Sequence, residues 1–136
     1  MNTACEQLEG AALSLARSGT IKDRLADAWR NHLALLDAEQ LPEPLRAEFR
    51  ACHAALTREP PLRGEDAIRA TVRKMSSQEA DELACSVVRL FAATVREVSR
   101  EEALESTEHT LSAVSAAARG KIKGVPQVVA LYAAEA

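Results

Sequence analysis

The chain has 136 residues, close to the commonest size of a single domain. Hydrophobic residues make up 47% of it, an ordinary globular share that argues against disorder, and the formal net charge is −3 at pH 7. A weakly acidic chain creates no global field that would attract nucleic acid or an anionic membrane surface, so both are disfavoured as partners.

Local signals along the chain predict helices. Aromatic residues amount to only 3%, so the core must be built mostly from Leu, Val and Ala rather than from the β-branched and aromatic runs typical of strands. At Thr3, Thr20, Ser76 and Ser99 a hydroxyl residue stands three positions ahead of a carboxylate, the capping-box spacing of a helix start. We therefore expect an all-α fold, a compact bundle of five to seven helices, with residues 1–136 as a single helical domain.

The first half of the chain is predicted to hold two long helices before a prolyl connector. Residues 4–17 form the first, which ends at Ser18-Gly19 because Gly supplies the left-handed residue that closes a helix. The second starts at Thr20 and has the most regular apolar stripe, at spacings of three and four. Its members are Ile21, Leu25, Ala28, Trp29, His32, Leu33 and Leu36.

The middle of the chain is predicted as a helix, a loop and a short helix. Residues 37–43 are a connector, and Pro42 or Pro44 begins a third helix that extends to Leu56. Residues 58–65 are an internal loop, because two consecutive prolines cannot continue a helix. Ile68, Val72 and Met75 mark the short fourth helix.

The fifth helix is expected after Ser76. Its apolar stripe comprises Ala80, Leu83, Ala84, Val87, Val88, Phe91, Val95 and Val98. Continued by threes and fours, the stripe meets Glu102 and Glu105, so a new helix is predicted from Ser99, with one long kinked helix as the alternative. The helix predicted from Ser99 has acidic residues at its start and basic residues at its end, an order that complements the helix dipole. Gly124-Val125-Pro126 then precedes a C-terminal docking segment, residues 124–136.

The histidines and cysteines do not form a metal-binding pattern. A di-iron bundle needs Glu three residues before His, and Trp29, Arg50 and Ser106 stand at those positions. Cys52 and His53 point about 100° apart on a helix, which disfavours zinc. We therefore predict no metal and no cofactor.

His32, Cys52 and His53 are nevertheless the candidate ligand-binding residues. If the second and third helices pair antiparallel, both imidazoles could meet Cys52 in the interior, where an imidazole can generate a thiolate. A hydrogen-bonded core histidine beside a buried thiol is the favoured interpretation, because no orienting Asn or Asp and no oxyanion loop accompanies the pair. No catalytic residue is assigned, and enzymatic activity is left open but not favoured.

A helix-turn-helix is also considered for residues 66–74 and the helix after them. Arg69, Arg73 and Lys74 would suit phosphates. The following helix, however, leads with Glu79, Asp81 and Glu82, a charge order that opposes entry into a DNA groove. DNA binding is therefore disfavoured.

The setting inferred from the sequence is a reducing cytoplasm. Three cysteines without a close pair do not suggest a disulfide framework, and residues 1–10 carry Glu6 and Glu9 where a signal peptide would be apolar. No stretch approaches the roughly 18–20 apolar residues of a membrane span. Arg outnumbers Lys and Ala is abundant, which is typical of a GC-rich bacterial genome.

The expected function follows from the C-terminal segment and from the lack of a catalytic set. Its candidate interaction residues are Val125, Val128, Val129, Leu131 and Tyr132. A segment of about ten residues is too short to be a stable isolated helix, so it should pack on its own chain or on a second copy. We expect a non-enzymatic interaction or regulatory module that forms a homodimer or binds a protein partner. The alternative is a small-molecule-binding bundle or enzyme with an interior pocket near His32, Cys52 and His53.

Overall fold

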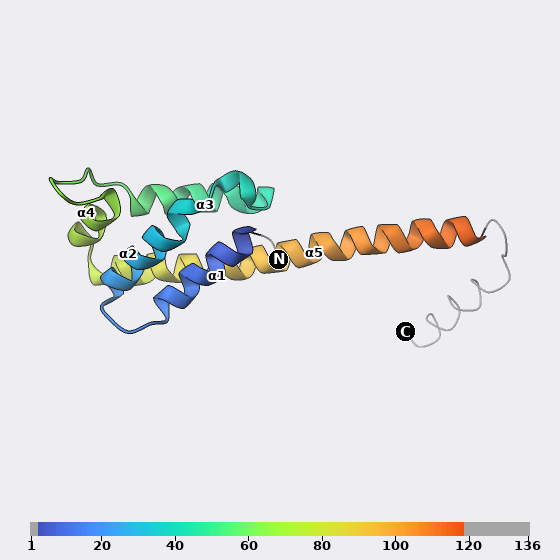
Figure 1. Ribbon diagram of the computed structural model, residues 1–136, viewed down its shortest axis with the longest axis horizontal. Coiled ribbons are helices and arrows are strands. Elements are labelled where there is room, and N and C mark those ends of the chain that lie inside the picture. Colours follow the sequence, from blue (N-terminus) through green and yellow to red (C-terminus); the bar gives the residue numbers. More distant parts are fainter. Residues whose placement is uncertain (1–2, 119–136) are drawn as a thin grey trace. The chain divides into compact units, whose positions relative to one another are not determined.

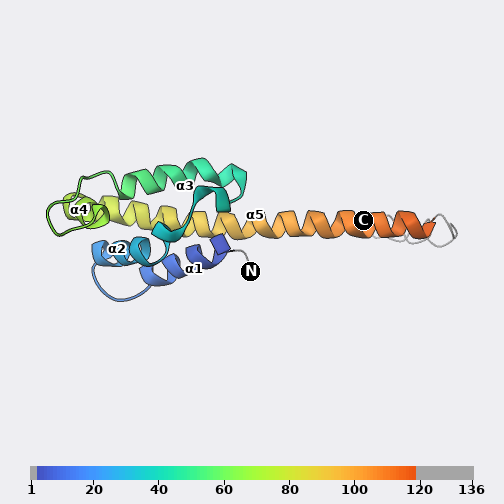
Figure 2. The same ribbon diagram turned by 45° about the horizontal axis from the view of Figure 1, so that its top comes forward.

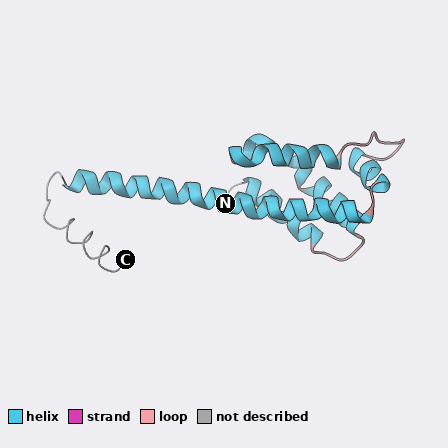
Figure 3. Cartoon of the chain, turned by 180° about the vertical axis from the view of Figure 1, so that it is seen from behind, coloured by secondary structure: helices cyan, strands magenta, loops and turns pink. Residues whose placement is uncertain are grey.

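The computed structural model describes residues 3–118, and the prediction of an all-α fold is confirmed for them. They contain five α-helices, two short 3₁₀ turns and no strand (Figure 3). The chain divides into two units, residues 1–98 and 99–136, which we describe one at a time. The predicted docking segment, residues 124–136, lies outside the described residues. No helix in the described part is long and apolar enough to cross a membrane.

The first unit contains four helices and the first part of a fifth (Figure 1). They are α1 (Thr3–Leu15), α2 (Ile21–Asn31), α3 (Glu43–Leu56), α4 (Ala67–Lys74) and α5 (Ser77–Ala118), with 3₁₀ turns η1 (Leu33–Leu35) and η2 (Ala38–Gln40) before α3. The first part of α5 runs between α3 on one side and α1 with α2 on the other (Figure 2). Residues 58–65 lie between the end of α3 and the start of α4.

The core of this unit is aliphatic, as the composition indicates. Its largest fully buried apolar side chains are Leu8, Leu25, Leu33, Leu41, Leu56, Ile68, Leu90, Val72 and Val87. Trp29 is buried, which confirms its place in the stripe of α2, and Phe49 is buried with it. Small residues allow close approach of the helices: Ala4, Ala11, Ala26 and Ala28 are fully buried.

The apolar face of α5 differs from the predicted stripe. The buried positions are Ala80, Ala84, Val87, Leu90 and Thr94. Val88 and Val95 are 46% and 40% exposed, and Phe91 packs only partly against the core. Phe91, which the predicted stripe includes, is half-buried and packs at the edge of the core. The helix is rotated relative to the predicted stripe, so that Leu90 and Thr94 face the core. Burial of the Thr94 hydroxyl is tolerated because it donates to the Leu90 carbonyl at 2.7 Å.

Among the predicted capping residues, Thr20 and Ser76 are confirmed and Ser99 is wrong. The Thr20 hydroxyl accepts from the backbone N–H of Asp23 at 3.1 Å, and the Ser76 hydroxyl accepts from that of Glu79 at 3.0 Å. Ser99 lies inside α5, which continues to Ala118. Residues 99–102 have the spacing of a capping box, which can start a helix. Arg and Glu are also good helix formers, so the same residues are equally compatible with the interior of α5.

The second helix is shorter than predicted. It ends at Asn31, and His32 is its C-cap, with its backbone N–H donating to the Ala28 carbonyl at 3.2 Å. Leu33 and Leu36 still reach the core, but they do so from η1 and from an extended residue. The connector then forms η2, which Asp37 and Gln40 cap reciprocally. Leu33 and Leu36 thus continue the apolar spacing of α2 because both are buried, although neither lies in an α-helix.

The second unit is described through residue 118, as the later part of α5. Every side chain described from 99 to 114 is exposed. Among these, Leu104, Leu111 and Val114 are large and apolar, with exposed fractions of 50%, 63% and 41%.

Candidate functional site

A groove of about 510 Å³ lies beside His53, between the turns η1 and η2 and helix α3. Its lining residues include Leu35, Leu36, Phe49, Arg50 and His53. Leu35 is 67% exposed and gives the groove an apolar rim. Arg50 donates to the carboxylate of Glu39 at 3.1 Å, so its charge is paired at the groove edge.

His53 lines this groove and packs against two aromatic rings. Its ring centroid lies 4.5 Å from that of Trp29, at an interplanar angle of 76°, and 6.2 Å from that of Phe49. Such edge-to-face contacts contribute about 0.5–1.5 kcal/mol beyond area burial. The imidazole therefore packs against Trp29 while it remains exposed to solvent.

His32 makes its contacts on a different helix. Its Nδ1 atom lies 3.3 Å from the Gln7 Oε1 atom on α1, and its ring packs against Gly10. The described contacts of His53, in contrast, lie on α2 and α3. Of the three candidate ligand-binding residues, only His53 is among those that line the groove.

Cys52 has the environment of a structural thiol. It is half-buried and packs against the core. Burial raises its pKa to about 11, and the negative charge of Glu48 adds to the shift. A thiol with that pKa stays protonated at neutral pH, and the thiolate is the nucleophilic form. The electrostatics thus favour the core interpretation of Cys52 over the Cys–His nucleophile.

The basic residues considered for phosphate binding are paired with acids. Arg69 donates to Asp23 at 3.0 Å, Arg73 to Glu65 at 2.9 Å, and Lys74 to Glu59 at 3.3 Å. These pairs join α4 to α2 and to the loop before α4. They compete directly with phosphate contacts, which adds to the charge-order argument against DNA binding.

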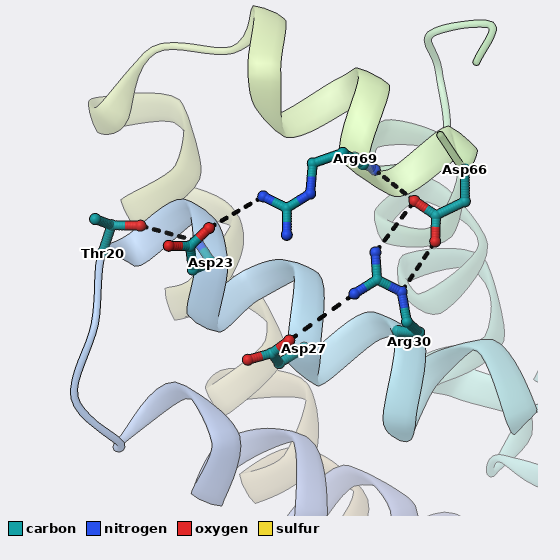
Figure 4. A network of polar contacts seen from close by, with 6 residues as sticks. All are labelled: Thr20, Asp23, Asp27, Arg30, Asp66 and Arg69. Carbon is teal, nitrogen blue, oxygen red and sulfur yellow. Dashed lines mark hydrogen bonds and ion pairs between the residues drawn. The ribbon is translucent and has the colours of Figure 1, made fainter. Parts of the chain in front are cut away.

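The ion pairs between α2 and α4 form one network (Figure 4). Arg30 binds the Asp66 carboxylate through two nitrogens, at 2.9 and 3.2 Å, and lies 3.9 Å from Asp27. Asp66 also caps α4 by accepting from the backbone N–H of Arg69 at 3.1 Å. The hydrogen bond from Arg30 holds the pKa of Asp66 below its usual value. These solvent-exposed contacts connect α4 to α2, and we assign them a structural role.

A second depression, which we name the Val88 slot, has a volume of about 360 Å³. It is lined by Leu15, Ile21, Arg24, Ala84, Cys85, Val88 and Arg89. Arg24 is committed to the end of α1, where it donates to the carbonyls of Leu15 and Gly19 at 2.5 and 3.1 Å. Within the described residues, Arg89 forms no ion pair. The slot therefore combines aliphatic walls with one available cation.

The sequence did not indicate this slot. Val88 was placed in the buried stripe of α5, and only the rotation of that helix exposes it beside Ile21 and Leu15. The described residues also contain no group of three His, Cys, Asp or Glu side chains placed to hold a metal ion. Comparison with models of protein families, with curated proteins and with solved structures finds no match for this chain.

Proposed function

We propose that this protein is a non-enzymatic helical interaction module that self-associates through the later part of α5. The observation that carries the proposal is the α5 stripe, which we define as Leu104, Leu111 and Val114. Isolated exposed apolar residues are normal on protein surfaces. These three, however, lie at spacings of seven and three, which places them on one side of a helix.

The energetics of an isolated helix support a partner for this stripe. Most helical stability in proteins comes from packing of an apolar face rather than from intrinsic propensity. In residues 99–114 all described side chains are exposed, so this unit buries no apolar side chain of its own there. Covering the stripe with a second copy would remove it from water, and a two-fold dimer is the commonest oligomer.

The proposal is tested by measuring mass with light scattering on the full chain. We expect a dimer at micromolar concentration and a monomer after Leu104→Glu with Leu111→Glu, because two charges would have to be desolvated in the interface. Ser106→Glu with Ala113→Glu is the matched control, since these exposed positions have the same spacing on the opposite side of the helix. A wild-type chain that is monomeric at high micromolar concentration would overturn the proposal.

The C-terminal segment is proposed to contribute to this interface, on the strength of its sequence. Val125, Val128, Val129, Leu131 and Tyr132 are its interaction candidates. Deleting residues 124–136 separates the two contributions. Loss of the dimer assigns the segment a part in the interface, whereas a dimer that survives places the interface on the main helices alone.

Small-molecule binding at the His53 groove is a second candidate function. It is favoured by one observation: the exposed imidazole of His53, held against Trp29 and Phe49, lines a groove of about 510 Å³, which is within the usual volume of ligand sites. A ligand screen read by thermal shift tests it. A shift that His53→Ala abolishes and His32→Ala retains supports this site, because the contacts of His32 lie on α1.

A further inference from the structure

We propose that the α5 stripe of one copy docks in the Val88 slot of a second copy, reciprocally, in a two-fold dimer. This inference rests on the self-association proposed above and adds the surface that receives the stripe. The occupant it names is the acidic and apolar part of α5 that contains Leu104 and Leu111. Its support comes from the shape of the slot and from the charges on both partners.

The slot is shaped for side chains of a helix rather than for an enclosed ligand. Leu15 ends α1, Ile21 begins α2 and Val88 lies on α5, so three elements supply its aliphatic walls. Val88 remains 46% exposed, which shows that the site is open to solvent. An open apolar depression of about 360 Å³ suits an aliphatic side chain presented by a partner helix.

The charges of the two surfaces are complementary. Arg89 lies at the slot and forms no ion pair among the described residues, while Arg24 is committed to backbone carbonyls. Beside the stripe, Glu101 and Glu108 are three residues before and four residues after Leu104. Arg100 is four residues before it, so this side of the helix carries two carboxylates and one guanidinium and is net negative. Docking Leu104 would bring these carboxylates toward the guanidinium of Arg89. Such charge complementarity favours one register of the α5 stripe in the slot and disfavours apolar partners that lack acidic residues.

A second copy is the occupant because each chain carries both complementary surfaces. Two copies that exchange stripes form two identical contacts related by a two-fold axis, so the assembly closes as a dimer. Pairing of the stripe with another stripe makes a different prediction. If the two α5 helices ran parallel, such pairing would bring the acidic residues around Leu104 of both copies together. In either orientation it would leave the Val88 slot uncovered.

Complementation between two variants tests the exchange. Val88→Glu blocks the slot, and Leu104→Glu with Leu111→Glu blocks the stripe. We expect each variant alone to be monomeric and an equimolar mixture to contain dimer, because the intact slot of one chain can accept the intact stripe of the other. With one of two contacts left, this dimer should dissociate at least tenfold more readily than the wild type. Circular dichroism must show that both variants keep their helices.

The alternative outcomes are distinguishable. A Val88→Glu variant that stays dimeric while the stripe variant is monomeric overturns the slot and leaves the proposed function in place. Two monomeric variants that fail to complement also overturn the exchange. A monomeric wild type, whether its slot is empty or filled from its own chain, overturns both proposals.

Charge and thiol measurements give an independent readout. Arg89→Glu should weaken the dimer about tenfold, and Glu101→Arg with Glu108→Arg should restore it. Arg96→Glu, another exposed arginine on α5 outside the slot, should leave the mass unchanged. Cys85 lines the slot, so its alkylation should be at least fivefold slower in the wild-type dimer than in the stripe variant. Equal rates would overturn the slot.

Discussion

The imidazole of His32 occupies the space that a side chain on Gly10 would need. A Cβ atom added to Gly10 would stand 2.4 Å from both Cε1 and Nδ1 of that ring. Glycine inside a helix normally costs about 0.5–1 kcal/mol relative to alanine. Its presence in α1 is explained by this close approach of α1 to the end of α2, where Gln7 contacts the same ring.

Gly10→Ala should therefore destabilise the protein, although it improves helix propensity. We expect a net loss of about 1–2 kcal/mol, because overpacking that displaces His32 outweighs a propensity gain of about 1 kcal/mol. Urea denaturation of Gly10→Ala, His32→Ala and the double variant gives the coupling between them. The double variant should recover most of the loss caused by Gly10→Ala. A Gly10→Ala variant that is more stable than the wild type would contradict the close packing of Gly10 against His32.

Ser76 and Ser99 have the same sequence signature and should behave differently. Ser76→Ala removes the hydroxyl that accepts from Glu79 and should cost about 1 kcal/mol. Ser99→Ala lies inside α5 and should be neutral or slightly stabilising, because alanine is the better interior residue. Thermal unfolding of the two variants checks this contrast. Equal losses would mean that a helix begins at Ser99.

Trp29 and Phe91 should differ in the cost of truncation. Trp29 is 8% exposed, so Trp29→Ala should cost about 3–5 kcal/mol, whereas half-buried Phe91 leaves a smaller cavity and should cost less. Denaturant unfolding measures both losses. Tryptophan emission gives a direct control, because it should be blue-shifted in the native protein. Emission typical of full water exposure would contradict the burial of Trp29.

The sequence predicts most helices here because their caps and apolar spacings are local. Thr20, Ser76 and the Pro60–Pro61 loop each act through neighbouring residues, so their effect can be inferred from a few letters. The end of α2 is different. Leu33 and Leu36 keep a helical spacing but reach the core through a 3₁₀ turn, and no Gly or Pro marks the change.

The candidate sites depended on contacts between distant segments. Which side of α5 faces the core is decided by packing against α1, α2 and α3, the helices that flank its first part in Figure 2. The resulting rotation exposes Val88 and leaves Phe91 only partly buried. Likewise, His32 and His53 were grouped because their predicted helices were expected to pair. The structure instead gives each ring its own partners, Gln7 and Gly10 for His32 and Trp29 for His53. Periodicity specifies a face but not the element that covers it.

The ion pair of Arg30 with Asp66 should make stability depend on pH in the acid range. The folded pKa of Asp66 is lowered, first by the hydrogen bond from Arg30, so its contribution is present above the unfolded pKa of about 3.9. The contribution is lost as the pH falls through the lower, folded value. Because the Asp66 side chain is 48% exposed, the ion pair itself should be worth well under 1 kcal/mol.

Asp66→Asn tests this dependence by urea denaturation between pH 2 and 7. We expect the variant to lose less stability on acidification than the wild type and to be up to about 1 kcal/mol less stable at pH 7. Asp27→Asn is the matched control, because its contact with Arg30 is longer, at 3.9 Å. Identical acid profiles for Asp66→Asn and the wild type would contradict the lowered pKa.

The three cysteines should react with iodoacetamide in the order of their exposure. Cys85 is exposed, Cys52 is half-buried and Cys5 is buried. The thiolate is the reactive form, and with a pKa of about 11 only about one Cys52 thiol in a thousand is ionised at pH 8. Peptide mass spectrometry on the Leu104→Glu, Leu111→Glu variant, in which the slot should be empty, follows each site separately. We expect Cys85 to react at least tenfold faster than Cys52, and Cys85→Ser to abolish the fast phase. Comparable rates at the two sites would instead show that Cys52 is an activated thiol and would favour the catalytic interpretation of its pairing with histidine.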